Sequence, residues 1–309
     1  MSVPDLKHLY KNRTLSDLHN FATSRTKYGI EYLCRLLLIH RRKEKDEIHF
    51  EDIEVAIERG RRWLENQQRP DGSIGKFEPR LWEIWNTANA ALALIETGGN
   101  KDCITNAVNF VFGGQLENGS FFFNYVPKAL KEHLYCNCIE TTGVALLAAY
   151  KSEKIVSKEV RKGLDFLIKA QNEDGSWELH YIPRNPKYPS VTGYALKTLL
   201  YLRVCPPKTF QKALAFLEIS QQSNGSWGRV SNYYNTESYA IKIISDALIL
   251  ARNEEWLTKK EREKIDMILQ RGISYITKKQ NHDGSWSAIG PSSKSISTAL
   301  YLQTLLNLS

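Results

Sequence analysis

The stretch Cys-Ile-Glu-Thr-Thr at residues 138–142 places one carboxyl group at the start of an apolar segment, GVALLAAY. A carboxyl that stays protonated in a dry cavity can donate its proton even to a very weak base such as an alkene. Glu140, at the top of an otherwise apolar helix, is therefore a candidate general acid. The alternative is that Glu140 only stabilises the helix start, where carboxylates are favoured.

The same region contains metal-ligand residue types at short spacing. His133, Cys136, Cys138 and Glu140 lie within HLYCNCIE. A Cys-x-Cys pair is a weaker zinc signal than two Cys-x-x-Cys units, so small buried thiols are the favoured interpretation. We expect no metal site here, with zinc as the alternative.

Composition excludes several classes of protein. The 309 residues are 42% hydrophobic and 25% charged, as in ordinary globular proteins. The 42 Lys and Arg and 34 Asp and Glu give a net charge of +8, and many of them lie in mixed runs such as HRRKEKDE, which are typical of solvated helix faces. Attraction to anions such as diphosphates, nucleic acid or acidic lipid is the alternative. No nucleic-acid-binding signature, Walker loop or Gly-x-Ser-x-Gly motif is present.

The amino terminus, the apolar runs and the cysteines bear on the compartment of the protein. The first residues lack a secretory apolar region, and the longest apolar runs are too short for a membrane span. The five cysteines form no regular framework, which favours reduced thiols. We expect a cytoplasmic protein.

Five polar turns with Asp or Asn before Gly recur along the chain. Three of them read QNEDGSW, QQSNGSW and QNHDGSW, and two weaker copies read QQRPDGSI and GGQLENGSF. Their glycines recur every 47 to 59 residues, in or just above the period of repeat architectures. Asp-Gly and Asn-Gly bend the chain, and the flanking Gln and Trp can hydrogen-bond and stack at a helix end.

Two kinds of helix flank these turns. Stretches before a turn, such as VRKGLDFLIKAQ, are amphipathic, whereas stretches after a turn, such as VTGYALKTLLYL, are apolar nearly all round. Alternating wet and dry helices suggest a closed ring with the dry helices inside, or an open solenoid. For the ring we expect two sets of residues, buried Ala91, Val144, Ala145, Leu196 and Ala240, and exposed Arg61, Lys162, Lys212 and Lys264.

The turns resemble the QW motif of squalene-hopene cyclases and related class II terpene cyclases. EIWNTANAALAL is similar to the family's VWDTA inner helix, and GSWGRVSNYYNT to its GSW-GRWGVNY-YGT element. The resemblance implies an all-α fold, an (α/α)6 toroid shared with protein prenyltransferase β subunits and present as a single β-type domain. We expect the toroid over residues 51–309, with residues 1–50 forming a helical segment packed on it.

The resemblance also implies roles for particular residues. Glu140 falls on the middle acid of the family's Asp-x-Asp-Thr-Thr motif, and Thr141 and Thr142 match its last two positions. Cys138 replaces the first Asp, and Tyr194 replaces the His that assists the acid in hopene cyclases. Both replacements remove assistance to the central acid.

Carbocation intermediates need aromatic walls, because ring faces stabilise positive charge without adding a nucleophile. Phe123 falls on a substrate-facing position of the family. The expected substrate-binding residues are Trp85, Phe122, Phe123, Tyr233, Tyr234 and Tyr239, with ordinary core packing as the alternative for each.

The resulting functional prediction is a protonation-initiated cyclase acting on a linear isoprenoid or prenyl diphosphate. Alternatives are a non-catalytic prenyl- or peptide-binding toroid derived from a cyclase, and a zinc-dependent prenyltransferase-like enzyme. No cofactor is required in this interpretation, and Mg²⁺ enters only if the substrate carries a diphosphate. We expect an isoprenoid ligand, no nucleic acid, and as further options membrane-surface association, a homodimer or a separately encoded helical partner.

Overall fold

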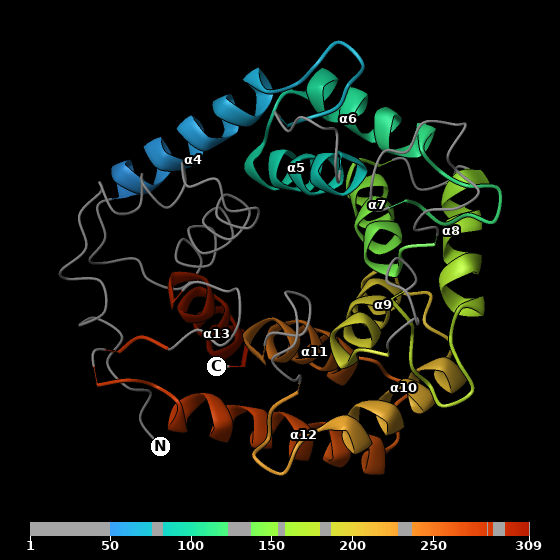
Figure 1. The fold of residues 1–309 in the computed structure, drawn as a ribbon, viewed down its shortest axis with the longest axis vertical. Helices are drawn as coiled ribbons and strands as arrows, with labels where there is room; N and C mark the ends of the chain where they lie inside the picture. Colours follow the sequence, from blue (N-terminus) through green and yellow to red (C-terminus); the bar gives the residue numbers. More distant parts are fainter. Residues whose placement is uncertain are drawn as a thin grey trace.

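Ten helices alternate between an outer and an inner ring in the computed structural model, which describes residues 50–75, 83–122, 137–153, 158–179, 187–227, 237–282, 284–286 and 294–308 (Figure 1). The outer helices are α4 (Phe50–Asn66), α6 (Lys101–Gly113), α8 (Lys158–Lys169), α10 (Pro207–Ser220) and α12 (Lys259–Lys278). The inner helices are α5 (Glu83–Thr97), α7 (Ile139–Lys151), α9 (Pro189–Tyr201), α11 (Glu237–Arg252) and α13 (Lys294–Leu308). Each inner helix contacts the next, from α5 to α13, so the predicted α/α toroid is confirmed.

Two parts of the predicted architecture fall outside the described residues. The N-terminal helical segment, residues 1–50, is described only at Phe50. Of the six helix pairs in the predicted (α/α)6 ring, the described residues contain five. Within the described part of the chain, no helix is long and apolar enough to cross a membrane.

The inner helices form the core because they are apolar on all sides. Ala91, Val144, Ala145, Leu196 and Ala240 are all fully buried, as predicted. Small residues let neighbouring helices approach closely, and a Cβ added at Gly193 of α9 would lie 3.2 Å from the Cα of Ile244 on α11. Burial on both flanks explains why these helices carry no regular polar face.

The predicted exposure of four basic residues on the outer helices was too high. Arg61, Lys162, Lys212 and Lys264 are half-buried rather than exposed. Arg61 donates a hydrogen bond to the carbonyl of Gly98, and Lys264 pairs with Glu218 at 2.6 Å. Long basic side chains therefore lie along neighbouring elements while their charged ends stay near solvent.

The repeated turns tie neighbouring outer helices together. The Gln171 side chain donates to the carbonyls of Gly175, within the turn, and of Thr209, on the following outer helix. The Trp177 indole donates to Leu167 O on the preceding outer helix at 2.8 Å. The Gln bonds recur at Gln68, Gln115 and Gln221, and the indole bond at Trp227 and Trp286.

Glycine is required at the centre of these turns. Gly175 has φ of +88°, and a Cβ there would lie 2.1 Å from the backbone oxygen of Lys212. A side chain at this position would therefore both strain the backbone and collide with the next outer helix.

Candidate active site

Glu140 lies in the first turn of α7 and is 1% exposed. The helix begins here because Cys138, in extended conformation, acts as the N-cap and accepts the Thr141 N–H on its sulfur at 3.4 Å. The Cys138 N–H donates to Phe121 O at 3.0 Å, which anchors the helix start to the preceding turn. The carboxyl is thus held at the start of a helix that is buried from Ile139 to Ala149, as the apolar sequence predicts.

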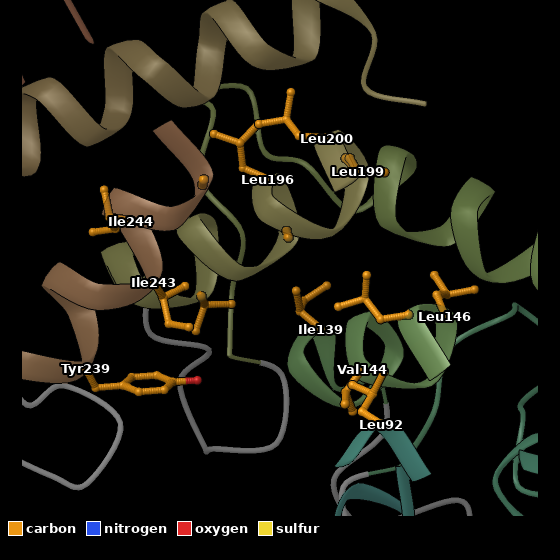
Figure 2. Packing of buried hydrophobic residues seen from close by; sticks show 14 of the residues in the cluster. Leu92, Ile139, Val144, Leu146, Leu196, Leu199, Leu200, Tyr239, Ile243 and Ile244 are labelled. Carbon is orange, nitrogen blue, oxygen red and sulfur yellow. The ribbon is translucent and has the colours of Figure 1, made fainter. Parts of the chain in front are cut away.

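Tyr239 of α11 reaches this carboxyl. Its hydroxyl donates to Glu140 Oε1 at 3.3 Å, although α9 separates α11 from α7 in the inner ring. Figure 2 shows the Tyr239 ring extending away from α11, with its oxygen at the far end. Tyr239 was predicted only as a substrate-lining residue, and its contact with the acid was not foreseen.

Thr142 serves the architecture of the repeat. Its hydroxyl accepts from the Phe121 N–H at 3.1 Å and donates to Cys138 O at 2.7 Å. Thr hydroxyls on three other inner helices accept the equivalent turn N–H, also at 3.1 Å, and these are Thr87, Thr192 and Thr298. Thr142 therefore has a structural role that its place in the motif does not reveal.

Thr141 has different surroundings. Its hydroxyl oxygen is buried and has no hydrogen-bond partner among the described residues. It follows Glu140 directly in the first turn of α7. An uncommitted hydroxyl beside a buried carboxyl is available to orient it or a ligand.

Cys138 is fully buried and is a free thiol. Burial, with a smaller contribution from the nearby Glu140 carboxylate, raises the pKa of this thiol to about 12. Cys138 is therefore a neutral thiol at physiological pH, as expected for a structural cysteine. The other residues of the zinc alternative, His133 and Cys136, lie outside the described residues, and within those residues no three His, Cys, Asp or Glu side chains are grouped to hold a metal.

Tyr194 packs beside the acid-bearing helix. A Cβ added at Gly143 would lie 3.0 Å from Tyr194 Cε1, so the ring rests on α7 within one turn of Glu140. The position that the resemblance assigns to an assisting His thus lies near the acid.

Two more predicted residues are buried on neighbouring segments. Trp85 precedes Thr87 of α5 by two residues, as Glu140 precedes Thr142 of α7, so both occupy the same level of the ring. Phe122 is 2% exposed and follows Phe121. Phe123, Tyr233 and Tyr234 lie outside the described residues.

A buried ionic cluster was missed at the sequence level. Asp246 of α11 binds Lys242 on its own helix at 2.5 Å and Lys197 of α9 at 2.7 Å, and it accepts from Asn307 of α13 at 3.0 Å. Burial alone would raise the pKa of the Asp246 carboxyl, but the two lysines hold that pKa below its ordinary value. Lys and Asp four residues apart inside the apolar stretch ESYAIKIISDALIL were the available signal.

The family model of the squalene-hopene cyclase C-terminal domain matches residues 45–206, just over half of the chain. The chain belongs to this family. Among the curated members it resembles, enfumafungin synthase efuA of Hormonema carpetanum is 25% identical over 249 residues, covering 65% of this chain and 18% of that protein. Drimenyl diphosphate synthase of Streptomyces showdoensis is 27% identical over 175 residues, covering 56% and 32%. The chain thus spans less than a third of the length of either relative.

Solved structures of terpene cyclases share this fold. The type II terpene cyclase MstE from Scytonema superposes with a TM-score of 0.62 at 14% identity, covering 95% of this chain and 98% of that one. A variant of MstE was solved in complex with geranylgeranyl dihydroxybenzoate. The ent-copalyl diphosphate synthase from Streptomyces platensis has a TM-score of 0.59 at 15% identity, covering 90% of this chain and 50% of that enzyme. At these identities the likeness establishes the fold of this squalene-hopene cyclase family member.

Proposed function

We propose that this protein is a class II terpene cyclase that starts ring closure by protonating an alkene or epoxide of a linear isoprenoid or prenyl diphosphate. The observation that carries the proposal is the Glu140 carboxyl, buried in the inner ring and in hydrogen-bond contact with Tyr239 of another inner helix. Membership of the cyclase family supports it, as do the isoprenoid complexes of MstE.

In the proposed reaction, protonated Glu140 transfers its proton to a terminal alkene carbon, which leaves a carbocation on the more substituted carbon. The π electrons of the next alkene then form the new carbon–carbon bond and move the charge along the chain. Loss of a proton or addition of water ends the reaction, and solvent returns a proton to Glu140. Ring faces of Trp85, Phe122 and Tyr194 supply the electron density that stabilises the cation.

Tyr239 acts in this proposal as a positioning residue. Its O–H donates to Glu140 Oε1, so it fixes the carboxyl and stabilises the carboxylate that remains after proton transfer. The hydrogen bond compensates for Cys138 and Tyr194, which replace the residues that assist the acid elsewhere in the family.

The decisive variant is Glu140→Gln, which keeps size and hydrogen bonding but lacks the transferable proton. Product formation from a panel of C15 to C30 isoprenoids should fall by at least ~10²-fold, as is typical for a lost general acid, while ligand binding persists. Full turnover with only a lower melting temperature would leave Glu140 as a helix-start residue. Binding without any product in the wild type would instead support a non-catalytic prenyl-binding toroid.

Glu83→Gln is the matched control. Glu83 is also a buried Glu in the first turn of an inner helix, but it pairs with Arg69. Its replacement should lower the melting temperature and leave the rate of cyclisation per folded molecule unchanged.

Cofactor and partner requirements follow from the same proposal. Proton-initiated cyclisation needs no cofactor, and Mg²⁺ would act only by binding a substrate diphosphate. An apolar cavity in the ring would need a cover, which residues 1–50, a second copy, a separately encoded helical partner or a membrane surface would supply. Light scattering and vesicle sedimentation of the purified protein distinguish these options.

A further inference from the structure

Gln303 of α13 is a buried amide without a hydrogen-bond partner in the described part of the chain. The residue is 1% exposed, and neither its amide nitrogen nor its amide oxygen is bonded to any described residue. Buried polar groups are nearly always hydrogen-bonded, and an unsatisfied one destabilises the folded state. This amide is therefore expected to meet a ligand or a bound water molecule.

The threonines that accept the turn N–H give the inner helices a common register. Thr298 of α13 and Thr142 of α7 each accept such a bond at 3.1 Å. Gln303 follows Thr298 by five residues, whereas Glu140 precedes Thr142 by two. The two side chains are thus seven residues apart in the common register, which is close to two full helical turns. They lie on the same face of their own helices, with Gln303 about 10 Å further along.

This helix face is directed toward the other inner helices. The Glu140 carboxyl is contacted by the Tyr239 hydroxyl, although α9 lies between their two helices in the ring (Figure 1). On α13, Asn307 lies one helical turn beyond Gln303 and donates to Asp246 of α11 at 3.0 Å. The face that carries Gln303 therefore points into the inner ring and not toward the outer layer.

The same position on three other inner helices holds residues that do not satisfy this amide. Five residues beyond their equivalent threonines lie Leu92 of α5, Leu147 of α7 and Lys197 of α9. The two leucines are buried and offer no polar group, and Lys197 pairs with Asp246 at 2.7 Å. Among these four residues, Gln303 is the neutral polar one.

Resting on the proposed function, we infer that Gln303 binds an O–H group inside the ring, about two helical turns from the acid. An amide presents N–H donors and a carbonyl acceptor, and a hydroxyl group both donates and accepts. A fully ionised diphosphate only accepts, so it would leave the amide oxygen without a partner.

Two molecules carry this O–H chemistry, a prenyl alcohol and water. Because ring closure moves the positive charge away from Glu140, a group about 10 Å beyond the acid can meet either the far end of the ligand or the last carbocation. In the first case Gln303 holds the terminal hydroxyl of the alcohol. In the second it holds a water molecule, whose oxygen bonds to the cationic carbon and whose extra proton passes to solvent.

The first source is tested in the Glu140→Gln background, where binding is measured without turnover. Calorimetric titrations compare farnesol and geranylgeraniol with the corresponding hydrocarbons that lack the hydroxyl. Gln303→Leu introduces the residue found at the same position of α5 and α7. It should lower the ratio of alcohol affinity to hydrocarbon affinity by at least about tenfold, because the ligand hydroxyl loses its partner.

Two further variants make this titration specific. Gln303→Met preserves more of the length of the glutamine side chain and should give the same loss. Gln211→Leu makes the same change on outer helix α10, where the amide donates to Glu261 at 2.8 Å, and should behave as the Glu140→Gln parent.

The second source is tested by product analysis in isotopically labelled water. An otherwise wild-type protein should form a labelled alcohol, and Gln303→Leu should shift the product from this alcohol to an alkene. An unchanged affinity ratio, without a labelled alcohol whose yield depends on Gln303, would overturn the inference. The two proposals fail separately, because the titrations need no turnover, whereas a wild type that binds isoprenoids but forms no product counts against the acid.

Discussion

Glu140 and the two threonines that follow it differ in what their side chains contact. Glu140 contacts Tyr239 across the ring, and Thr142 bonds to the backbone of Phe121 and Cys138. The Thr141 hydroxyl has no hydrogen-bond partner within the described residues. A motif position therefore does not define a role by itself. Substitution of Thr142 should mainly lower stability, whereas substitution of Thr141 should mainly lower turnover.

Thr142→Ala should lower the free energy of unfolding by about 1–3 kcal/mol, because the buried Phe121 N–H loses its acceptor. Cyclisation per folded molecule should change little. Thr141→Ala should be nearly neutral in stability, because no hydrogen bond is lost, and should reduce turnover less than Glu140→Gln does. Urea unfolding and initial rates measure both effects, and Thr142→Ser should restore stability. A stable but inactive Thr142→Ala protein would contradict this division.

The repeated turn is the element that sets the spacing between helices. Its Gln and Trp side chains bond to the backbone of the outer helices on either side, and its glycine fits against the next outer helix. These contacts are made to backbone atoms of the outer helices. They therefore restrict the residue types of the turn strongly and the residue types of the contacted helix positions weakly.

Gly175→Ala should therefore destabilise the protein by at least about 2–3 kcal/mol, because φ is +88° and the added Cβ would meet Lys212 O. Gly60→Ala is the matched control, since Gly60 lies inside α4 with no atom within 4 Å of an added Cβ. That change should be stabilising by about 0.5–1 kcal/mol. Thermal and urea unfolding give both values, and similar small effects for the two variants would refute the turn's role.

At the scale of the whole molecule, the ionic cluster links three inner helices. Asp246→Asn would remove the carboxylate that both Lys197 and Lys242 contact and should cost about 3–5 kcal/mol. Asp246→Asn with Lys197→Met should recover part of this loss. If the Asp246→Asn protein were as stable as the wild type, the cluster would not stabilise the ring.

The cluster also predicts a pH dependence. Because the folded-state pKa of Asp246 is lowered, its contribution to stability is complete above the unfolded pKa of about 4 and is lost as pH falls below it. Urea unfolding between pH 7 and pH 3 should show a loss of stability below about pH 4. The Asp246→Asn variant should show a shallower loss over the same range.

The sequence alone determined the alternation of two kinds of helix, the repeated turns and the place of Glu140 at a helix start, because each depends on short-range patterns. Asp-Gly and Asn-Gly turns, a helical repeat of apolar residues and the Cys-Ile-Glu-Thr-Thr stretch are all read within about twenty residues. The burial of Ala91, Val144, Ala145, Leu196 and Ala240 follows from the same patterns.

Only the tertiary structure decided which side chains meet. The hydroxyls that accept the turn N–H lie 12 to 21 residues beyond it, because the connecting segments differ in length, so spacing did not reveal the shared role of Thr142. Tyr239 and Glu140 are 99 residues apart, and Lys197, Asp246 and Asn307 lie on three different helices. Such contacts arise when the ring closes and brings distant helix faces to one axis, which no local pattern encodes.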